Sequence, residues 1–187
     1  MLRPPKTLVK LLCLISVLVF STPVFADAQS ASALFVDTVF KECSAVALGV
    51  SQLEGNVGLH ASGFRRATPD QELRLQHPVK GKPVVFMAAD GDQKFTAMQY
   101  PKSNQCIVTS FGPHLASLVK AAKNEISSSN FEFEFDPLSS GPQGPIIVEV
   151  FKSKTIDSAN FRVSIAASPP GEKGMPIVIA TVGFTKD

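Results

Sequence analysis

The clearest catalytic pattern in the chain is S-L-V-K at residues 117–120, which matches the S-x-x-K pattern of penicillin-binding proteins and class A β-lactamases. In those enzymes the serine is an acylated nucleophile. No S-D-N follows here, and K-T-I at residues 154–156 lacks the glycine of K-T-G. On a helix whose apolar face is centred near Leu115, Ser117 lies about 200° away and should point to water. We therefore predict no catalytic residue in this pattern.

The spacing of the histidines and aspartates does not predict a metal site either. The histidines His60, His77 and His114 form no H-x-H or H-E-x-x-H pattern that would place two nitrogens on one ion. Asp90 and Asp92 flank a glycine, but the residues that follow do not supply the remaining oxygen ligands of a calcium loop. We predict a turn there, and neither a metal nor a cofactor; a cluster of histidines that forms only in the fold is the alternative left open.

The sequence F-E-F-E-F at residues 131–135 alternates with the period of a β-strand, so one face is aromatic and the other acidic. An acidic face can bind cations, or it can be the solvated side of a sheet. Arg162 and Lys152, in neighbouring predicted strands, offer opposite charges to Glu132 and Glu134. We predict the solvated side, with the three phenylalanines in the core.

Two of the three cysteines are predicted to form a disulfide. Cys13 lies inside an apolar run near the start of the chain, whereas Cys43 and Cys106 lie in the body of the chain and have no C-x-x-C spacing. Exported proteins commonly pair such cysteines. The bridge would close a long loop, which the chain-entropy model values at about 4 kcal/mol.

Residues 1–26 have the three parts of a secretory signal peptide. Arg3, Lys6 and Lys10 precede the apolar run "LLCLISVLVF", and "STPVFADA" supplies small residues where signal peptidase cuts. We expect cleavage after Ala26, with a cut after Ala28 as the alternative. The apolar run is too short to span a bilayer comfortably, so we expect a periplasmic or secreted protein with no membrane anchor.

Removal of the leader changes the charge of the chain. The full sequence has 18 basic and 16 acidic residues, and positions 1–26 hold three of the basic and none of the acidic ones, so the mature chain is near −1. A basic surface for nucleic acid is therefore not expected. The segment 27–187 has the length of a single domain.

Two amphipathic helices are predicted. Apolar residues recur at spacings of three and four between Ser32 and Val50, with Cys43 near the middle of the stripe and Ser44 on the far side. A second helix follows Pro113. Its predicted buried face comprises Leu115, Leu118, Val119, Ala122 and Ile126.

Residues 51–83 show neither the helical period of three to four residues nor the strand period of two, and they contain four glycines and three prolines. We predict a long irregular connection with a short strand at Glu72–Gln76. Segments of this kind are often functional. A candidate ligand surface therefore lies here, formed by Arg65, Arg66, Arg74 and His77.

The remaining segments alternate like strands. Residues 84–99 form a predicted hairpin about Asp90-Gly91-Asp92, a third strand spans residues 105–112, and four more follow between Phe131 and Phe184. The predicted fold class is α+β, with an antiparallel sheet of about six to seven strands and the two helices packed on it. Both halves of the chain run from a helix into a meander.

The helix with its inward cysteine, the hairpin and "QCIVTSFGPHLASLVKAA" resemble a diffuse group of small uncharacterised exported proteins of proteobacteria. The likeness covers about residues 33 to 126. It implies a periplasmic location and no particular activity.

Function is therefore predicted mainly from location. We expect a non-enzymatic binding or interaction protein whose partner is a protein or a small ligand of the periplasm, bound through the sheet or through residues 51–83. One alternative is a small hydrolase or metal-dependent enzyme whose site assembles in the fold from two or more of His60, His77, His114, Asp90 and Glu125. The other is an envelope-assembly or stress component, which a large exposed apolar patch would favour.

Overall fold

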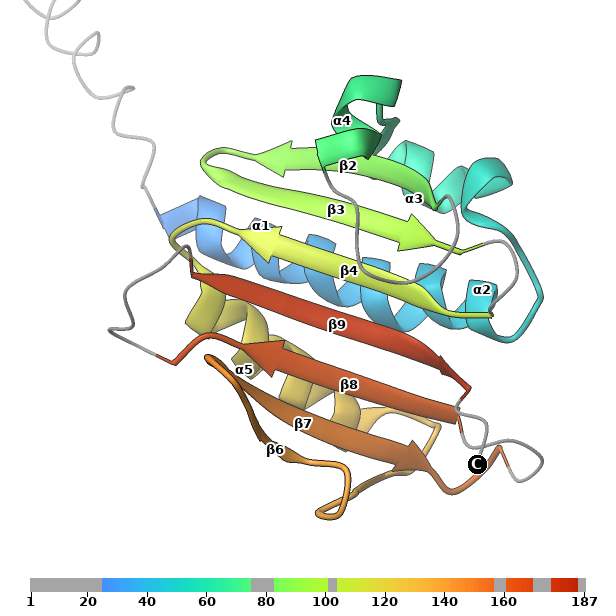
Figure 1. Ribbon diagram of the computed structural model, residues 1–187, viewed down its shortest axis with the longest axis vertical. Helices are drawn as coiled ribbons and strands as arrows, with labels where there is room; N and C mark the ends of the chain where they lie inside the picture. Colours follow the sequence, from blue (N-terminus) through green and yellow to red (C-terminus); the bar gives the residue numbers. More distant parts are fainter. Residues whose placement is uncertain (1–24, 75–82, 101–103, 157–160, 170–175, 185–187) are drawn as a thin grey trace, which may run out of the picture.

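The fold is built on one antiparallel sheet with two long helices across one of its faces (Figure 1). The structure is a computed structural model that describes residues 25–74, 83–100, 104–156, 161–169 and 176–184. The predicted signal peptide, at positions 1–26, lies almost wholly outside this range. Within the described ranges, the predicted α+β class is confirmed.

The sheet has nine strands in the order β1-β2-β3-β4-β9-β8-β7-β5, and β6 pairs with β7 beside this path. The strands are β1 Arg65–Arg66, β2 Val84–Asp90, β3 Gln93–Gln99, β4 Cys106–Phe111, β5 Phe133–Phe135, β6 Gly141–Gln143, β7 Ile146–Ser153, β8 Phe161–Ala167 and β9 Ile177–Phe184. The predicted count of six to seven was too low. The two missed strands, β1 and β6, are two and three residues long, too short to display a period of two.

The two halves of the chain meet in the middle of the sheet. β2, β3 and β4 form one meander and β7, β8 and β9 form the other, and the last strands of the two meanders pair antiparallel from Cys106↔Val182 to Phe111↔Ile177. The helix that precedes each meander lies on the same face of the sheet, behind it in Figure 1. The predicted hairpin between residues 84 and 99 is present, with Gly91 at φ 56° in its turn.

The first helix is continuous but not uniform. It consists of α1 Phe25–Val36, a π-helical segment η1 Asp37–Cys43 and α2 Ser44–Ala47. The prediction was right that residues 32–47 are helical, although the helix begins earlier, at Phe25. It was also right about Cys43, which is fully buried. It was wrong about Ser44, which is buried too, because the i→i+5 bonds of a π-helix widen the turn and shift the buried stripe. It was also wrong about Val50, which lies beyond the helix and is 78% exposed.

The second helix, α5 Leu115–Ser128, buries Leu118, Ala122 and Ile126 as predicted. The start of this helix is bonded to the side chain of Gln93, which belongs to the first meander. The buried amide of Gln93 accepts a hydrogen bond from the His114 N–H at 3.0 Å and donates one to the Ser110 hydroxyl at 2.7 Å. The β3 strand thereby positions the helix that belongs to the second meander.

The segment predicted to be irregular is mostly structured where it is described. It forms a short 3-10 turn η2 Leu53–Gly55, then α3 Val57–Ala61, β1 and α4 Pro69–Arg74. The predicted strand at Glu72–Gln76 was wrong, since its first three residues are helical and the others lie outside the described residues. The sequence carried a signal for this helix, because Thr68 and Gln71 form a reciprocal capping box with proline at the first helical position.

The two predicted disulfide cysteines are paired across the core. Cys43 ends η1 and Cys106 begins β4, their Sγ atoms are bonded, and their Cα atoms are 5.2 Å apart. Both residues are fully buried. The bridge therefore joins the first helix to the centre of the sheet.

The alternating phenylalanines fit the prediction only in part. Phe131 and Phe133 are half-buried, with ring centroids 5.6 and 6.2 Å from the ring of buried Phe161. Phe135 is 49% exposed, since β5 is an edge strand with a neighbour on one side only. On the acidic face Glu134 pairs with Lys154 at 3.3 Å, whereas the two predicted cationic partners bind another residue, described below.

Candidate functional site

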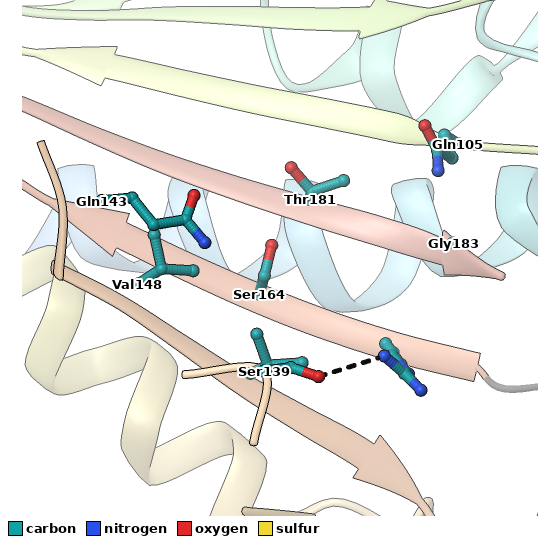
Figure 2. A pocket seen from close by; sticks show the side chains of 9 residues that line it. Gln105, Ser139, Gln143, Val148, Ser164, Thr181 and Gly183 are labelled. Atoms are coloured by element: carbon teal, nitrogen blue, oxygen red, sulfur yellow. Dashed lines mark hydrogen bonds between the residues drawn. The ribbon is translucent and has the colours of Figure 1, made fainter. Parts of the chain in front are cut away.

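A hollow of about 300 Å³ lies on the open face of the sheet, meaning the face turned away from α1 and α5 (Figure 2). Its floor consists of Val148 and Val150 of β7, Arg162 and Ser164 of β8, and Thr181 and Gly183 of β9. Its rim consists of Gln105, Ser139 and Gln143. The helices lie behind the sheet in this view, so the hollow is formed by strands and turns alone.

Strand alternation explains why these side chains reach the open face. On β8 and β9, Arg162, Ser164 and Thr181 alternate with core residues such as Val163 and Val182, which belong to the cluster packed under the helices. A period of two thus gives the central strands one apolar face for the core and one partly polar face for the hollow.

Glycine at position 183 allows the rim to approach the floor. A Cβ built on Gly183 would lie 2.7 Å from the Cγ atom of Gln105 and 3.1 Å from the carbonyl oxygen of Asn104. Any larger residue would push the Gln105 side chain off β9. The absence of a side chain at this position therefore helps to shape the end of the hollow.

A buried carboxylate organises the opposite rim. The side chain of Asp136 is 4% exposed and lies 3.0 Å from the Lys152 ammonium and 3.8 Å from the Arg162 guanidinium. It also accepts hydrogen bonds from the Ser139 hydroxyl at 2.6 Å and from the Leu138 N–H at 3.2 Å. These are the cations expected to face Glu132 and Glu134. Lys152 is indeed the cross-strand partner of Glu134 in the β5–β7 register, but its ammonium and the Arg162 guanidinium both approach Asp136.

The pKa of Asp136 is lowered to about 2. The hydrogen bond from Ser139 is the largest cause, followed by the one from Lys152, and both stabilise the ionised carboxylate more than burial destabilises it. Asp136 is therefore an anion at any physiological pH, and the cluster of Asp136, Lys152 and Arg162 has one surplus positive charge.

The turn that carries the rim is tied to β7 by a hydroxyl. Ser140 donates to the Asp136 carbonyl at 2.7 Å and accepts from the Val150 N–H at 2.9 Å, while the Asp136 N–H donates to the Val150 carbonyl at 2.8 Å. These bonds hold the turn against the strand. They fix Ser139 at the edge of the hollow.

Arg162 links this cluster to the hollow. Its contacts with Asp136 and with the Ser139 hydroxyl, the latter at 3.4 Å, are both made through one terminal nitrogen, Nη1 (dashed in Figure 2 for Ser139). Its Nε atom is buried and has no hydrogen-bond partner among the described residues. A buried donor without a partner calls for an explanation in a folded protein.

The residues predicted to form a ligand surface lie elsewhere. Arg65 donates to the carbonyls of His60 and Phe64 at 3.1 and 3.0 Å. Arg66 pairs with Glu72 at 2.9 Å and Glu54 at 3.7 Å.

The guanidinium of Arg66 also lies 5.8 Å from the centroid of the Phe86 ring. The side chain of Arg74 and all of His77 lie outside the described residues. The surface predicted around Arg65, Arg66, Arg74 and His77 stays a prediction, and neither of its two described side chains lines the hollow.

The candidates for an enzyme site do not meet in the hollow. His60 is on α3, Asp90 ends β2, and His114 and Glu125 belong to the start and the body of α5; none of the four lines the hollow. In the described ranges no group of three or more histidine, cysteine, aspartate or glutamate residues is placed to hold a metal ion. Ser117 of the S-x-x-K pattern is exposed on α5, as predicted.

Sequence reasoning missed the hollow and Asp136. A local signal existed, because aspartate before proline with serine three residues later, D-P-L-S at 136–139, is typical of a side-chain-bonded turn. The approach of this turn to Arg162, on a strand far along the chain, has no such signal. In the described part of the chain, no helix combines the length and apolar character needed to cross a bilayer. Comparisons with protein-family models, curated proteins and solved structures found no match.

Proposed function

We propose that this chain is an exported, non-enzymatic binding protein that holds a small ligand in the hollow of the open face. The hollow is the observation that carries the proposal. Its volume of about 300 Å³ is at the lower end for ligand pockets, and its mixture of apolar floor and convergent polar groups is typical of them.

Two features support export. The segment 1–26 has the pattern of a cleavable signal peptide. The Cys43–Cys106 bridge is of a kind that forms and persists in oxidising compartments. The proposed location is therefore the periplasm or the outside of the cell, in line with the resemblance to exported proteins of proteobacteria.

The two alternative functions have less support. A hydrolase or metal enzyme would need its acid, base or ligands in a common cleft, and the described candidates lie on α3, β2 and α5, away from the hollow. An envelope-assembly component would need a contiguous apolar surface. The large exposed apolar side chains among the described residues fall in two separate stretches of sequence, 48–57 and 135–147.

The proposed function is tested by measuring which residues respond when the protein binds a small molecule from a natural mixture. The mature protein, labelled with nitrogen-15, is titrated with a small-molecule extract of bacterial periplasm and followed by amide spectra. We expect shifts at Ser164, Thr181 and Gly183. The variant Ser164→Phe, which fills the hollow, should lose them, whereas Ser117→Phe on the exposed face of α5 should keep them.

Shifts confined to the surroundings of Arg65 and Arg66 would move the ligand to the surface predicted from the sequence. Loss of binding in both phenylalanine variants would mean that the effect is not specific to the hollow. Turnover of a component of the extract, with no effect of Ser164→Phe, would favour the enzyme alternative.

A further inference from the structure

We propose that the ligand of the hollow is a small carboxylic acid with an apolar chain, bound by Arg162. This inference rests on the proposed function, because it assigns a chemical class to the ligand of that same site. The geometry of the guanidinium, the charge around it and the lining of the hollow each contribute one step.

The first step is the unused edge of the guanidinium. Asp136 and Ser139 are both contacted through Nη1, at 3.8 and 3.4 Å, and the buried Nε has no partner within the described chain. The Nε and Nη2 donors form one side of a planar fork that matches the two oxygens of a carboxylate. Because this Nε is enclosed, a carboxylate would reach it through a small turn of the Arg162 side chain towards the hollow, and would then satisfy the donor that the described protein leaves unpaired.

The second step is charge. Asp136 is held more closely by Lys152, at 3.0 Å, than by Arg162, at 3.8 Å. Two cations therefore share one carboxylate, and the more distant cation lines the hollow. The side chain of Arg162 is 18% exposed, so its charge is only partly solvated and its attraction for an anion is stronger than at an open surface.

The third step is the remainder of the lining. Val148 and Val150 of β7 line the hollow together with Arg162, and the paired residues Ser164 of β8 and Thr181 of β9 add hydroxyl groups to it. A phosphate or sulfate would place its full charge against one arginine and leave the valines uncovered. A carboxylate with a short apolar chain matches both the single cation and the apolar floor.

The experiment uses three probes on the mature protein: hexanoate, hexanamide and inorganic phosphate. The side-chain Nε–H signal of Arg162 is followed together with the backbone amides. Hexanoate should shift the Nε–H signal of Arg162 and the amides of Ser164 and Thr181. Hexanamide, which has the same chain without the charge, should bind at least about tenfold more weakly, since hydrogen bonds to charged groups contribute more than neutral ones.

Two variants distinguish the contribution of the planar Arg162 guanidinium from that of positive charge alone. Arg162→Lys keeps a cation but lacks the planar fork, and should weaken hexanoate binding about tenfold or more. Lys154→Gln removes a cation that pairs with Glu134 outside the hollow, and should leave binding unchanged. The Nε–H shift in the wild-type protein is an independent readout that does not depend on how the Arg162 variant folds.

The outcomes also separate this inference from the proposed function. Equal binding of hexanoate and hexanamide in the hollow would overturn the carboxylate assignment and leave a binding function in place. Tighter binding of phosphate than of hexanoate would overturn it in favour of an inorganic anion. If hexanoate shifts signals elsewhere but not the Arg162 Nε–H signal or the amides of the hollow, the carboxylate assignment is also overturned. The titration with periplasmic extract then tests the proposed function separately.

Discussion

At the scale of single residues, Asp136 has the most consequential environment on the open face. It is a nearly buried carboxylate that contacts Ser139 at the rim of the hollow, Arg162 in its floor and Lys152 nearby. Removing such a carboxylate lowers the free energy of unfolding, because the cations and the hydroxyl that contact it lose their partner while remaining partly buried. The shape of the hollow therefore depends on a residue that does not line it.

We predict that Asp136→Asn lowers the melting temperature and that the loss depends on pH. The folded pKa of Asp136 is about 2, below its usual value of 3.8, so its ionisation stabilises the folded state above pH 3.8. This contribution declines as pH falls from about 4 towards 2. The difference in unfolding free energy between wild type and variant should therefore be largest near neutral pH and shrink across that window.

The measurement is urea unfolding of both proteins at a series of pH values. Glu134→Gln is the matched control, because Glu134 forms an exposed pair with Lys154, and exposed pairs contribute about 0–1 kcal/mol. A difference between wild type and Asp136→Asn that stays constant from pH 7 to pH 2 would contradict the depressed pKa of Asp136.

At the scale of elements, the disulfide and the amide of Gln93 attach the helices to the sheet. The bridge ties the end of η1 to the start of β4. The Gln93 side chain ties β3 to the start of α5. Each connection joins elements that are distant in sequence, so each limits how the helices can shift against the strands.

We predict that Cys43→Ser destabilises the protein by about 2–5 kcal/mol, the usual cost of losing a native disulfide, and lowers the melting temperature by several degrees. The variant with both cysteines changed to serine should melt close to either single variant, since each change already removes the bridge. Thermal unfolding of oxidised protein measures this. Two thiols that react in the folded wild-type protein without denaturant would contradict the pairing.

At the scale of the whole molecule, two helix-and-meander halves share one sheet, and the long helices cover only one of its faces. The other face is partly covered by α4 and by the turns around β6, and between them it carries the hollow. Among the described elements, the long helices thus leave the hollow on the face that they do not cover.

We predict that the exported protein begins at Asp27 or Gln29 and is released by osmotic shock. The first residue described as fully buried is Ala31, so a chain starting at Asp27 keeps the described core and should fold. A chain starting at Val36 lacks Ala31 and Phe35, both fully buried, and should melt at a clearly lower temperature. Intact mass and thermal unfolding are the measurements; a periplasmic protein that retains the segment 1–26 would refute the processing.

Local pattern was sufficient for much of this protein. The period of three to four residues located both long helices, and the period of two located the longer strands. The presence of two cysteines in the predicted mature chain indicated the Cys43–Cys106 pair, and the apolar stripe placed Cys43 in the core. These features are readable because each is repeated along a continuous segment, and because burial of a helix stripe or a strand face imposes that repetition on the sequence.

The hollow and its charges were decided only by the tertiary structure. Arg162 and Lys152 were expected to pair with Glu132 and Glu134. Lys152 does lie opposite Glu134, but the turn at residues 136–140 folds against β7 and brings Asp136 close to both cations. The positive φ of 46° at Glu132 and the π-helical segment before Ser44 were not predicted either. Contacts between segments so far apart in the chain leave no period in the sequence, because they depend on where separate elements dock, and that is settled by the burial of the core as a whole.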